Sequence, residues 1–427
     1  MVLKMIKLQV FHVLTAMKRK FIEQLKPETM INHDKKSFTR KRKLDMRRLT
    51  TIILRCSPKA LQEKLDDFFE EIGHKEEVVS KQAFSKARTN LDPSVLRKSF
   101  EMTAEILSSC EDLTLYKNKY RLCAIDGSTI VLDNASELLN YFGGSGSNHD
   151  CVSALASICY DPLNDIILDG QLHPYSHSER AVAVEHFNYV ETLPLPSGVT
   201  NLFTMDRGYG SKELIADMID RSHHFILRVR DKFNLDIDNA SNNQRVSFKV
   251  NNKHYEVRVF KILLNSGVVE TLITNLEDGY MSSEEAGELY FNRWKVETKF
   301  DILKNKLELE NMSGRRVITT FQDFWAKLDI ANTVAALKFC TDEQIETNMN
   351  PENKYAQTTN QNRLISKFSQ RYIELLLSND LDAQLALFDE LVSDISRRPV
   401  EVKPDRSFVR KKPKKKKFSD RHRRPLS

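Results

Sequence analysis

Residues 120–129 read YRLCAIDGST, and this stretch carries the features that decide the fold. A short apolar run with β-prone residues favours a buried strand over a helix. The run ends in a carboxylate, Asp126, and Gly127 then lets the chain turn away. Ligand sites in α/β sheets lie at such strand ends. The stretch therefore predicts a strand that presents an aspartate at its end.

The same pattern recurs in NLFTMDRGYG at residues 201–210, where Asp206 ends the predicted strand. Either aspartate alone could be a turn former before glycine. The surrounding sequence predicts a hairpin of strands and then strands separated by helices, at 152–161, 166–175, 178–193, 211–222 and 224–230. Hairpinned strands followed by strand–helix–strand units describe a mixed α/β sheet with helices on its faces.

The rest of the chain is organised around this sheet. Residues 1–112 have helical periodicity, and residues 231–270 form short alternating strands with Asn-Asn turns, which predicts a β-rich insertion. Ser282 and Glu285 predict a capping box that opens a helix. We expect four segments: a basic helical region at 1–112, a central domain at 113–340, a helical region at 341–402 and a basic tail at 403–427.

The helix after the capping box contains ELYFNRWKVETKFDILKNKLELE at residues 288–310. At about 100° per residue, Tyr290, Arg293, Glu297 and Lys304 fall within a wedge of roughly 60°. A solvated face with an i, i+4 ion pair would explain Arg293 and Glu297. It would leave the tyrosine and the distant lysine unexplained.

These residues resemble the motif of the IS4-type transposases, which is Tyr, two residues, Arg, three residues, Glu, six residues and Lys. The first two carboxylates of that family match in AIDGST and TMDRGYGS, and the flanking phrases LITNL and ENMSGRR are similar as well. The resemblance implies a ribonuclease-H-like DDE catalytic domain at 113–340. It spans about residues 80–415, and residues 1–80 match no motif of the family. The helical periodicity predicts N-terminal and C-terminal helical regions, and the N-terminal helices and the basic tail would bind the DNA ends.

The resemblance assigns roles to individual residues. Asp126, Asp206 and Glu297 would be the catalytic carboxylates and the ligands of two Mg²⁺ ions, for which Mn²⁺ would substitute. Tyr290, Arg293 and Lys304 would bind DNA phosphates. Trp294 and Tyr209 are candidates for stacking on a flipped base, with core packing as the alternative for Trp294. The stacking tryptophan that relatives carry in their insertion has no counterpart in residues 231–270.

Elementary chemistry supports the metal site. Three converging carboxylates repel one another unless cations lie between them, and hard divalent ions prefer carboxylate oxygens. Two such ions can serve both the attacking and the leaving oxygen when a phosphodiester is broken.

The charge is unevenly distributed. Residues 1–50 and residues 403–427 each carry a net charge of +10, whereas residues 51–402 carry −14. Basic ends fit a protein that holds a polyanion, although solvated tails are the alternative. We therefore expect DNA as the partner, in the form of terminal inverted repeats and target DNA. The pairing of two ends implies a homodimer.

Other features limit the alternatives. The six scattered cysteines show no C-x-x-C pair, which argues against a disulfide framework or a thiolate zinc site. No apolar run approaches a membrane span, and we expect a bacterial cytoplasmic protein without a membrane partner. His173 and His177 are interpreted as loop residues. Lys81, Lys86 and Arg88 lie either along a phosphate backbone or on an ordinary surface helix.

Two rival functions stay open. The first is a domesticated DNA-binding protein that has lost catalysis. The presence of all the motif residues argues against it. The second is a ribonuclease-H-like nuclease that never joins strands, which would give no reason for the motif stripe or the basic ends.

Overall fold

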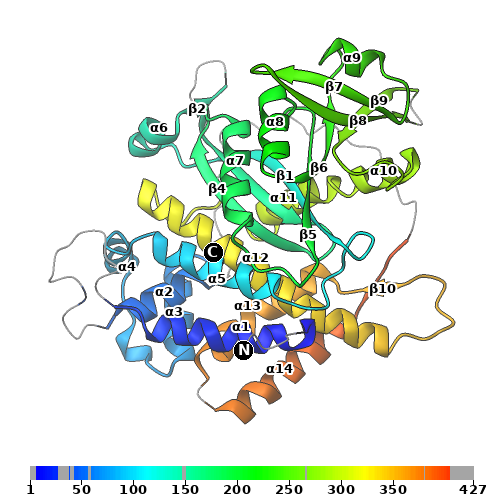
Figure 1. The fold of residues 1–427 in the computed structure, drawn as a ribbon. Coiled ribbons are helices and arrows are strands. Elements are labelled where there is room, and N and C mark those ends of the chain that lie inside the picture. Colours follow the sequence, from blue (N-terminus) through cyan, green and yellow to red (C-terminus); the bar gives the residue numbers. More distant parts are fainter. Residues whose placement is uncertain are drawn as a thin grey trace. The chain divides into compact units, whose positions relative to one another are not determined.

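The computed structural model describes residues 6–26, 38, 43–55, 59–146, 151–264, 267–378 and 380–403. They divide into two units. Figure 1 shows the fold, coloured by position along the sequence. The helical unit comprises the described residues of Met1–Glu111, Ile130–Ala154 and Leu303–Ser427, and the sheet unit comprises Asp112–Thr129 and Leu155–Ile302. Most of the basic tail predicted at 403–427 lies outside the described residues.

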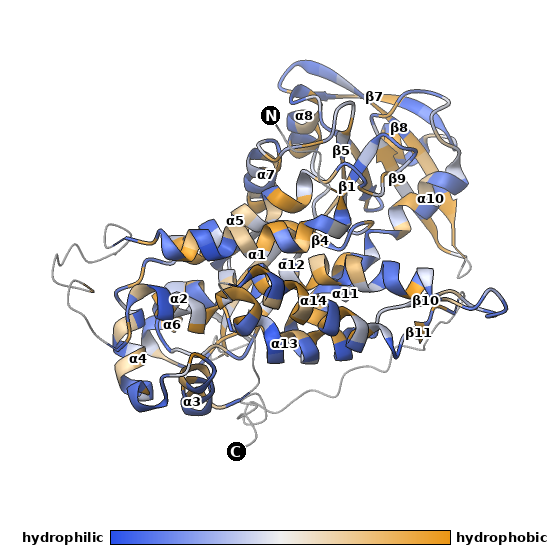
Figure 2. Ribbon diagram, turned by 90° about the horizontal axis from the view of Figure 1, so that it is seen from below, coloured by the Kyte–Doolittle hydropathy of each residue, from blue (hydrophilic) through white to orange (hydrophobic). Residues whose placement is uncertain are grey.

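The helical unit is built from amphipathic helices. Helix α13 buries Leu364, Phe368 and Tyr372, which recur every three to four residues along one face, and Figure 2 shows both hydrophobic and hydrophilic residues on this helix. The helices and short strands of this unit are α1 (Lys7–Glu23), α2 (Met46–Ile53), α3 (Leu61–Glu71), α4 (Lys81–Arg88), α5 (Ser94–Ser108), α6 (Ser136–Phe142), β2 (Gly144–Ser145), α12 (Val317–Thr347), β10 (Gln357–Thr358), α13 (Gln361–Leu377), α14 (Leu381–Ser396) and β11 (Val400–Glu401), with a 3₁₀ turn at Lys75–Glu77.

Helix α12 forms the centre of this unit, and α1, α5 and α14 pack against it. It buries Asp329, whose carboxylate pairs with the buried Lys18 of α1 and accepts hydrogen bonds from Ser99 and Thr103 of α5. A buried charge needs such partners. Helix α12 also continues to Thr347, beyond residue 340, where the sequence suggested a boundary between segments.

The position of Arg88 contradicts the expectation that it lies on a surface helix or along a phosphate backbone. We considered it as a phosphate contact on α4, but its side chain is buried and pairs with Asp323 at 2.8 Å. It also donates to Gln322 and Ser313. Polar residues on α12 and just before it therefore pair with the guanidinium. An unpaired buried cation would be unstable.

The sheet confirms the expected mixed α/β fold class. Nine strands are joined in the order β2-β3-β1-β5-β6-β9-β8-β7, with β4 beside β3. Strands β1, β5 and β6 are parallel, and β6, β9, β8 and β7 pair antiparallel. The strands are β1 (Tyr120–Val131), β3 (Cys151–Asp161), β4 (Ile166–Pro174), β5 (Thr200–Met205), β6 (His224–Val229), β7 (Gln244–Val250), β8 (Lys253–Leu263) and β9 (Val269–Thr274).

The predicted β-rich insertion is part of this same sheet. After the short helix α9 (Leu235–Asn239), β7 and β8 form a hairpin whose second strand pairs with β9. The insertion therefore lengthens the main sheet on its antiparallel side.

Helices cover the sheet, as Figure 1 shows for α7 (Glu179–Val190) and α8 (Lys212–Asp220). Helix α7 packs against β4, and α8 packs against β6. Helix α10 (Ser283–Phe291) begins at the predicted Ser282–Glu285 capping box. It buries Leu289 and Tyr290 in a core with Phe260 of β8.

The long helix that we expected after Ser282 is divided in two. Helix α10 ends at Phe291, and α11 (Trp294–Asn305) begins three residues later. Between them, the backbone amide of Arg293 donates to Tyr290 and that of Val296 to Arg293, which are tight i, i+3 bonds. The side chain of Asn292 also bonds back to the carbonyl of Glu288. Asparagine competes with the helix in this way.

In the part of the chain that the structure describes, no helix combines the length and apolarity needed to cross a membrane.

Candidate active site

Asp126 and Asp206 stand next to each other where two parallel strands stop pairing. The pairing of β1 with β5 ends with Ile125 opposite Met205. Each aspartate is therefore the residue that directly follows the last pair. Strand β1 continues to Val131, whereas we expected it to end at Asp126. Because both strands run in the same direction, their carboxylates emerge at one edge of the sheet.

Both aspartates accept a hydrogen bond from the amide of a following glycine, although Gly127 lies within β1 and only Gly208 lies in a turn. The amide of Gly127 lies 3.0 Å from Oδ1 of Asp126, and the amide of Gly208 donates to Oδ1 of Asp206 at 2.7 Å. A side chain at Gly127 would bring its Cβ within 2.8 Å of Oε1 of Glu179. Glycine therefore lets the Glu179 carboxylate lie close to the strand, which a larger residue would displace.

Arg293 links Glu297 to Asp126, because its guanidinium contacts both carboxylates. Nη2 of Arg293 lies 3.2 Å from Oε1 of Glu297, and its Nη1 lies 3.9 Å from Oδ2 of Asp126. Arg293 occupies the turn between α10 and α11, and its side chain is 5% exposed. The break between the helices thus sets a buried guanidinium between two carboxylates.

The three carboxylates affect one another electrostatically. The pKa of Asp126 is raised to about 7, first by burial and then by the charges of Asp206 and Glu297, while Arg293 lowers it. A single guanidinium therefore does not compensate the buried negative charge. Near neutral pH, part of the metal-free protein would hold a proton on Asp126.

This donor set fits hard divalent cations. It consists of carboxylates, and the raised pKa of Asp126 reports excess negative charge that bound cations would relieve. The carboxylates are spread apart: among the described residues, the sets whose three ligand atoms all lie within 4.8 Å of one another are His173–His177–Glu185 and His74–Glu76–Glu77. Like charges separate in this way without counterions.

The stretch 117–332, just over half of the sequence, matches the family described as transposase DDE domain. The chain belongs to this family. DDE transposases generally use divalent metal ions, in agreement with the carboxylate donor set.

Comparison with solved structures finds a likeness to a piggyBac transposase, solved by cryo-electron microscopy as a synaptic complex with hairpin DNA. The identity is 10% and the TM-score 0.46, and the match covers 92% of this chain and 87% of the other. No protein with a curated description matches the sequence.

A fourth carboxylate of the chain lies beside the aspartates. Glu179 opens helix α7, and its Oε2 would lie 3.9 Å from a Cβ at Gly208. Burial raises its pKa, and the charge of Asp206 raises it further. The next residue, Arg180, donates to the carbonyl of Gly208 at 3.2 Å. The sequence offers no spacing rule that pairs Glu179 with Gly127.

The two aromatic candidates for base stacking differ in exposure. Tyr209 is fully buried, and burial raises the pKa of its hydroxyl, as do the charges of Glu179 and Asp126. Trp294 is 38% exposed, so the core-packing alternative does not describe it. The guanidinium of Arg293 lies 5.1 Å from the centre of the Trp294 ring, a distance typical of cation–π contacts.

Tyr290 is buried in the sheet unit, whereas Lys304 belongs to the helical unit. Tyr290 is 4% exposed, and its ring centre lies 5.6 Å from the Arg293 guanidinium. Lys304 lies on α11 beyond Ile302 and so belongs to the helical unit. Its Nζ lies 3.9 Å from Oε1 of Glu310, and burial lowers its pKa.

A buried hydrogen-bond chain supports Asp126 from behind, and sequence reasoning missed it. Oγ of Ser157 donates to the backbone carbonyl of Asp126 at 3.1 Å and lies 2.9 Å from Nε2 of His186. Nδ1 of His186 lies 2.7 Å from Oδ2 of Asp169. The signal was His186 itself, a polar residue among the buried positions of α7.

The hydrogen bonds of this chain determine where protons lie. A hydroxyl has one proton to donate. If Ser157 gives it to Asp126, Nε2 of His186 must carry a proton that Ser157 accepts. A second proton then lies between Nδ1 of His186 and Oδ2 of Asp169. The two side chains share this proton as a buried hydrogen-bonded pair.

Replacing His186 by phenylalanine would remove the imidazole partner of the buried Asp169 and leave it the hydrogen bond from Gln171. We expect the free energy of unfolding to fall by about 3 kcal/mol, the usual cost of breaking a buried charged pair. Urea unfolding of the metal-free protein measures this, with the exposed His254→Phe as a control that stays within about 0.5 kcal/mol. A loss below about 1 kcal/mol for His186→Phe would show that the chain does not support the site.

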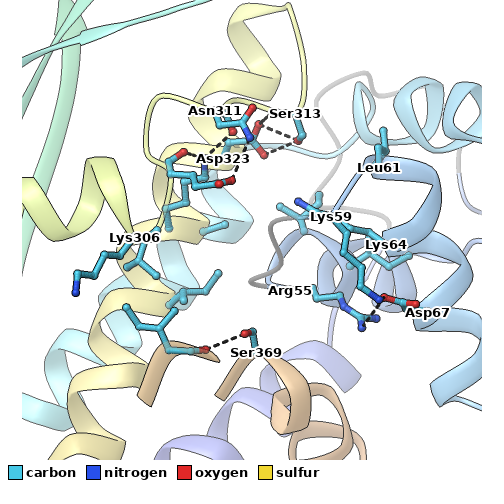
Figure 3. A pocket seen from close by; sticks show the side chains of 18 of the residues that line it. Arg55, Lys59, Leu61, Lys64, Asp67, Lys306, Asn311, Ser313, Asp323 and Ser369 are labelled. Carbon is cyan, nitrogen blue, oxygen red and sulfur yellow. Dashed lines mark hydrogen bonds and ion pairs between the residues drawn. The ribbon is translucent and has the colours of Figure 1, made fainter. Parts of the chain in front are cut away.

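The helical unit contains a cavity of about 650 Å³, shown in Figure 3. Arg55 lines it and pairs with Glu71 at 2.5 Å, while Lys59 pairs with Asp67 at 2.7 Å. Carboxylates thus neutralise these two cations of the wall. With Lys64, Arg88, Lys306 and Lys327 against Glu308 and Asp323, the rest of the lining keeps an excess of cations.

Proposed function

We propose that this protein is an IS4-type DNA transposase that moves an insertion sequence by a cut-and-paste reaction. Asp126, Asp206 and Glu297 are the catalytic residues, and together they hold Mg²⁺, with Mn²⁺ as a substitute. The observation that carries the proposal is that Asp126 and Asp206 follow the last paired residues of two adjacent parallel strands while Arg293 contacts both Asp126 and Glu297, in a chain of the DDE transposase family. When bound, two such ions would stabilise both oxygens of the phosphodiester that is broken.

The residues of the chain itself position the DNA. Arg293 and Lys304 offer charge to phosphate oxygens, Arg293 as a fork and Lys304 as a point charge. Tyr290 packs against Arg293 and orients it beneath the DNA strand. Trp294, the exposed aromatic residue, is the better candidate for stacking on a base, because Tyr209 is buried.

The DNA partners are the terminal inverted repeats of the element and the target DNA. The net charge of +10 in each end of the chain supports this, because cations that neutralise phosphates supply most of the non-specific affinity for DNA. Two element ends must be joined to one target, so the active form is a homodimer assembled on DNA.

The test uses the purified chain, Mg²⁺ and DNA that carries the inverted repeats flanking the gene. Strand-transfer products that join the element end to a target plasmid are the expected result. Cleavage without joining would favour a ribonuclease-H-like nuclease. Binding without cleavage would favour the rival proposal of a domesticated DNA-binding protein.

Glu179→Gln tests whether the fourth carboxylate supports this site. Glu179 lies beside Gly127 and Gly208, the glycines that follow the two aspartates, and groups that support metal ligands change metal affinity or activity by about 10–100-fold. We expect cleavage to need a higher Mg²⁺ concentration and to be about tenfold slower. The exposed Glu213→Gln of α8 is the control, and equal Mg²⁺ dependence of the two variants would exclude Glu179 from the site.

A further inference from the structure

Two histidines and a glutamate meet where strand β4 leads into helix α7. His173 lies near the end of β4, His177 lies in the following turn, and Glu185 lies on α7. The two imidazole rings are stacked, with centres 4.3 Å apart and planes inclined by 13°. Both rings turn a nitrogen towards the same carboxylate: Nε2 of His173 lies 3.1 Å from Oε2 of Glu185, and Nε2 of His177 lies 3.8 Å from Oε1.

The donor-atom separations are close to those of a set of metal ligands, and a turn of the stacked rings away from each other would point both nitrogen lone pairs at one ion. Zn–N and Zn–O bonds of about 2.0–2.2 Å at tetrahedral angles place the donor atoms roughly 3.3–3.5 Å apart. The two separations to Glu185, 3.1 and 3.8 Å, lie on either side of that value. The longer one exceeds a hydrogen bond, so hydrogen bonding to Glu185 does not explain why His177 is held there.

The donor types select the class of metal. Two imidazoles and one carboxylate suit zinc and neighbouring transition metals, whereas Mg²⁺ prefers oxygen donors alone. The side chains of His177 and Glu185 are 37% and 40% exposed, so an ion can reach the three donors from solvent.

We propose that His173, His177 and Glu185 bind a transition-metal ion of the zinc class. Three protein ligands leave the fourth tetrahedral position to water. The ion ties the end of β4 to α7, the helix whose first residue, Glu179, lies beside Gly127 and Gly208. It is therefore a positioning site for α7, separate in donor chemistry from the carboxylates of Asp126, Asp206 and Glu297.

The other three-ligand set in the described residues makes a weaker candidate. His74, Glu76 and Glu77 lie within four residues of one another, the Glu76 side chain is 74% exposed, and Glu77 pairs with Arg48 at 2.5 Å. All three donors lie on one exposed turn, so an ion bound there would tie no second element to it. This set serves as a matched control.

The test titrates the full-length, EDTA-treated protein with ZnCl₂ by calorimetry, and with CoCl₂ by visible absorption. Wild type is expected to bind one Zn²⁺ per chain at this site with a Kd below about 1 µM, and Co²⁺ to show the absorption bands of tetrahedral coordination. The double variant His173→Ala/His177→Ala is expected to weaken this binding by at least about 100-fold. His74→Ala and Asp126→Asn should keep it.

Two results would overturn the proposal. One is wild-type Zn²⁺ binding weaker than about 100 µM, and the other is unchanged binding by the double variant. Glu185→Gln keeps the side-chain shape and repeats the test if the double variant fails to fold, which circular dichroism in EDTA would reveal. Its retention of wild-type affinity and of the Co²⁺ bands would likewise refute the site. Neither readout depends on DNA cleavage, so the outcome is independent of the proposed transposase activity.

Discussion

We expect the replacement of Asp126 by asparagine to abolish DNA strand cleavage, with a loss of at least about 10³-fold, and to leave DNA binding unchanged. The substitution removes the carboxylate charge but keeps the shape. Removing a single preorganised electrostatic group from an active site costs about 10²–10³-fold, and residues that act as a unit lose their function together. Asp206→Asn and Glu297→Gln should therefore fall to the same residual rate as Asp126→Asn.

Cleavage of end-containing DNA in Mg²⁺ measures this loss, and a gel-shift assay in EDTA measures binding. Asp236→Asn on α9 is the control, because this exposed aspartate lies in the same unit but outside the site. A triple carboxylate variant tests the unit directly. If its loss equalled the product of three independent losses, the carboxylates would not act as one site.

Asparagine at position 126 also stabilises the metal-free protein at alkaline pH. The pKa of Asp126 rises from an ordinary value of 3.8 to about 7 in the folded protein, chiefly through burial. The folded state therefore binds more protons than the unfolded state between these values. Its stability falls as pH rises through this window and levels off above pH 7. One pKa unit corresponds to 1.36 kcal/mol, so the total penalty is up to about 4 kcal/mol.

Urea unfolding in EDTA tests this sign. We expect Asp126→Asn to be more stable than wild type, with an advantage that grows by about 2–3 kcal/mol between pH 5 and pH 8. Excess Mg²⁺ at pH 8 should remove much of the difference, because only the wild type gains stability from binding the ion. An asparagine variant that is less stable than wild type at pH 8 would mean that Arg293 already compensates the charge.

The sequence predicts the elements that carry the site better than it predicts their contacts. Apolar strands ending in Asp126 and Asp206 are visible in the sequence, but the register that sets Ile125 opposite Met205 depends on the folded sheet. The turn between α10 and α11 has no glycine or proline to announce it. Local bonds from Asn292 and Arg293 produce it, and it aims Arg293 at two carboxylates.

Tertiary contacts explain the remaining differences. Arg88 looks like a surface cation on a short helix, yet Asp323, more than two hundred residues away, holds it in the interior. Trp294 has an apolar side chain that suggests the core, yet it is exposed beside Arg293. The partners of Glu179, His186 and His173 come from other strands or turns, so no spacing along one helix could reveal them.

The central claim is that Asp126, Asp206 and Glu297 together hold divalent cations. Anomalous diffraction from crystals soaked in Mn²⁺ tests it most directly. The account predicts Mn²⁺ peaks at about 2.1 Å from carboxylate oxygens of these three residues, with none at this site in Asp126→Asn crystals. Occupied Mn²⁺ sites elsewhere in the wild type, with these carboxylates bare, would contradict it.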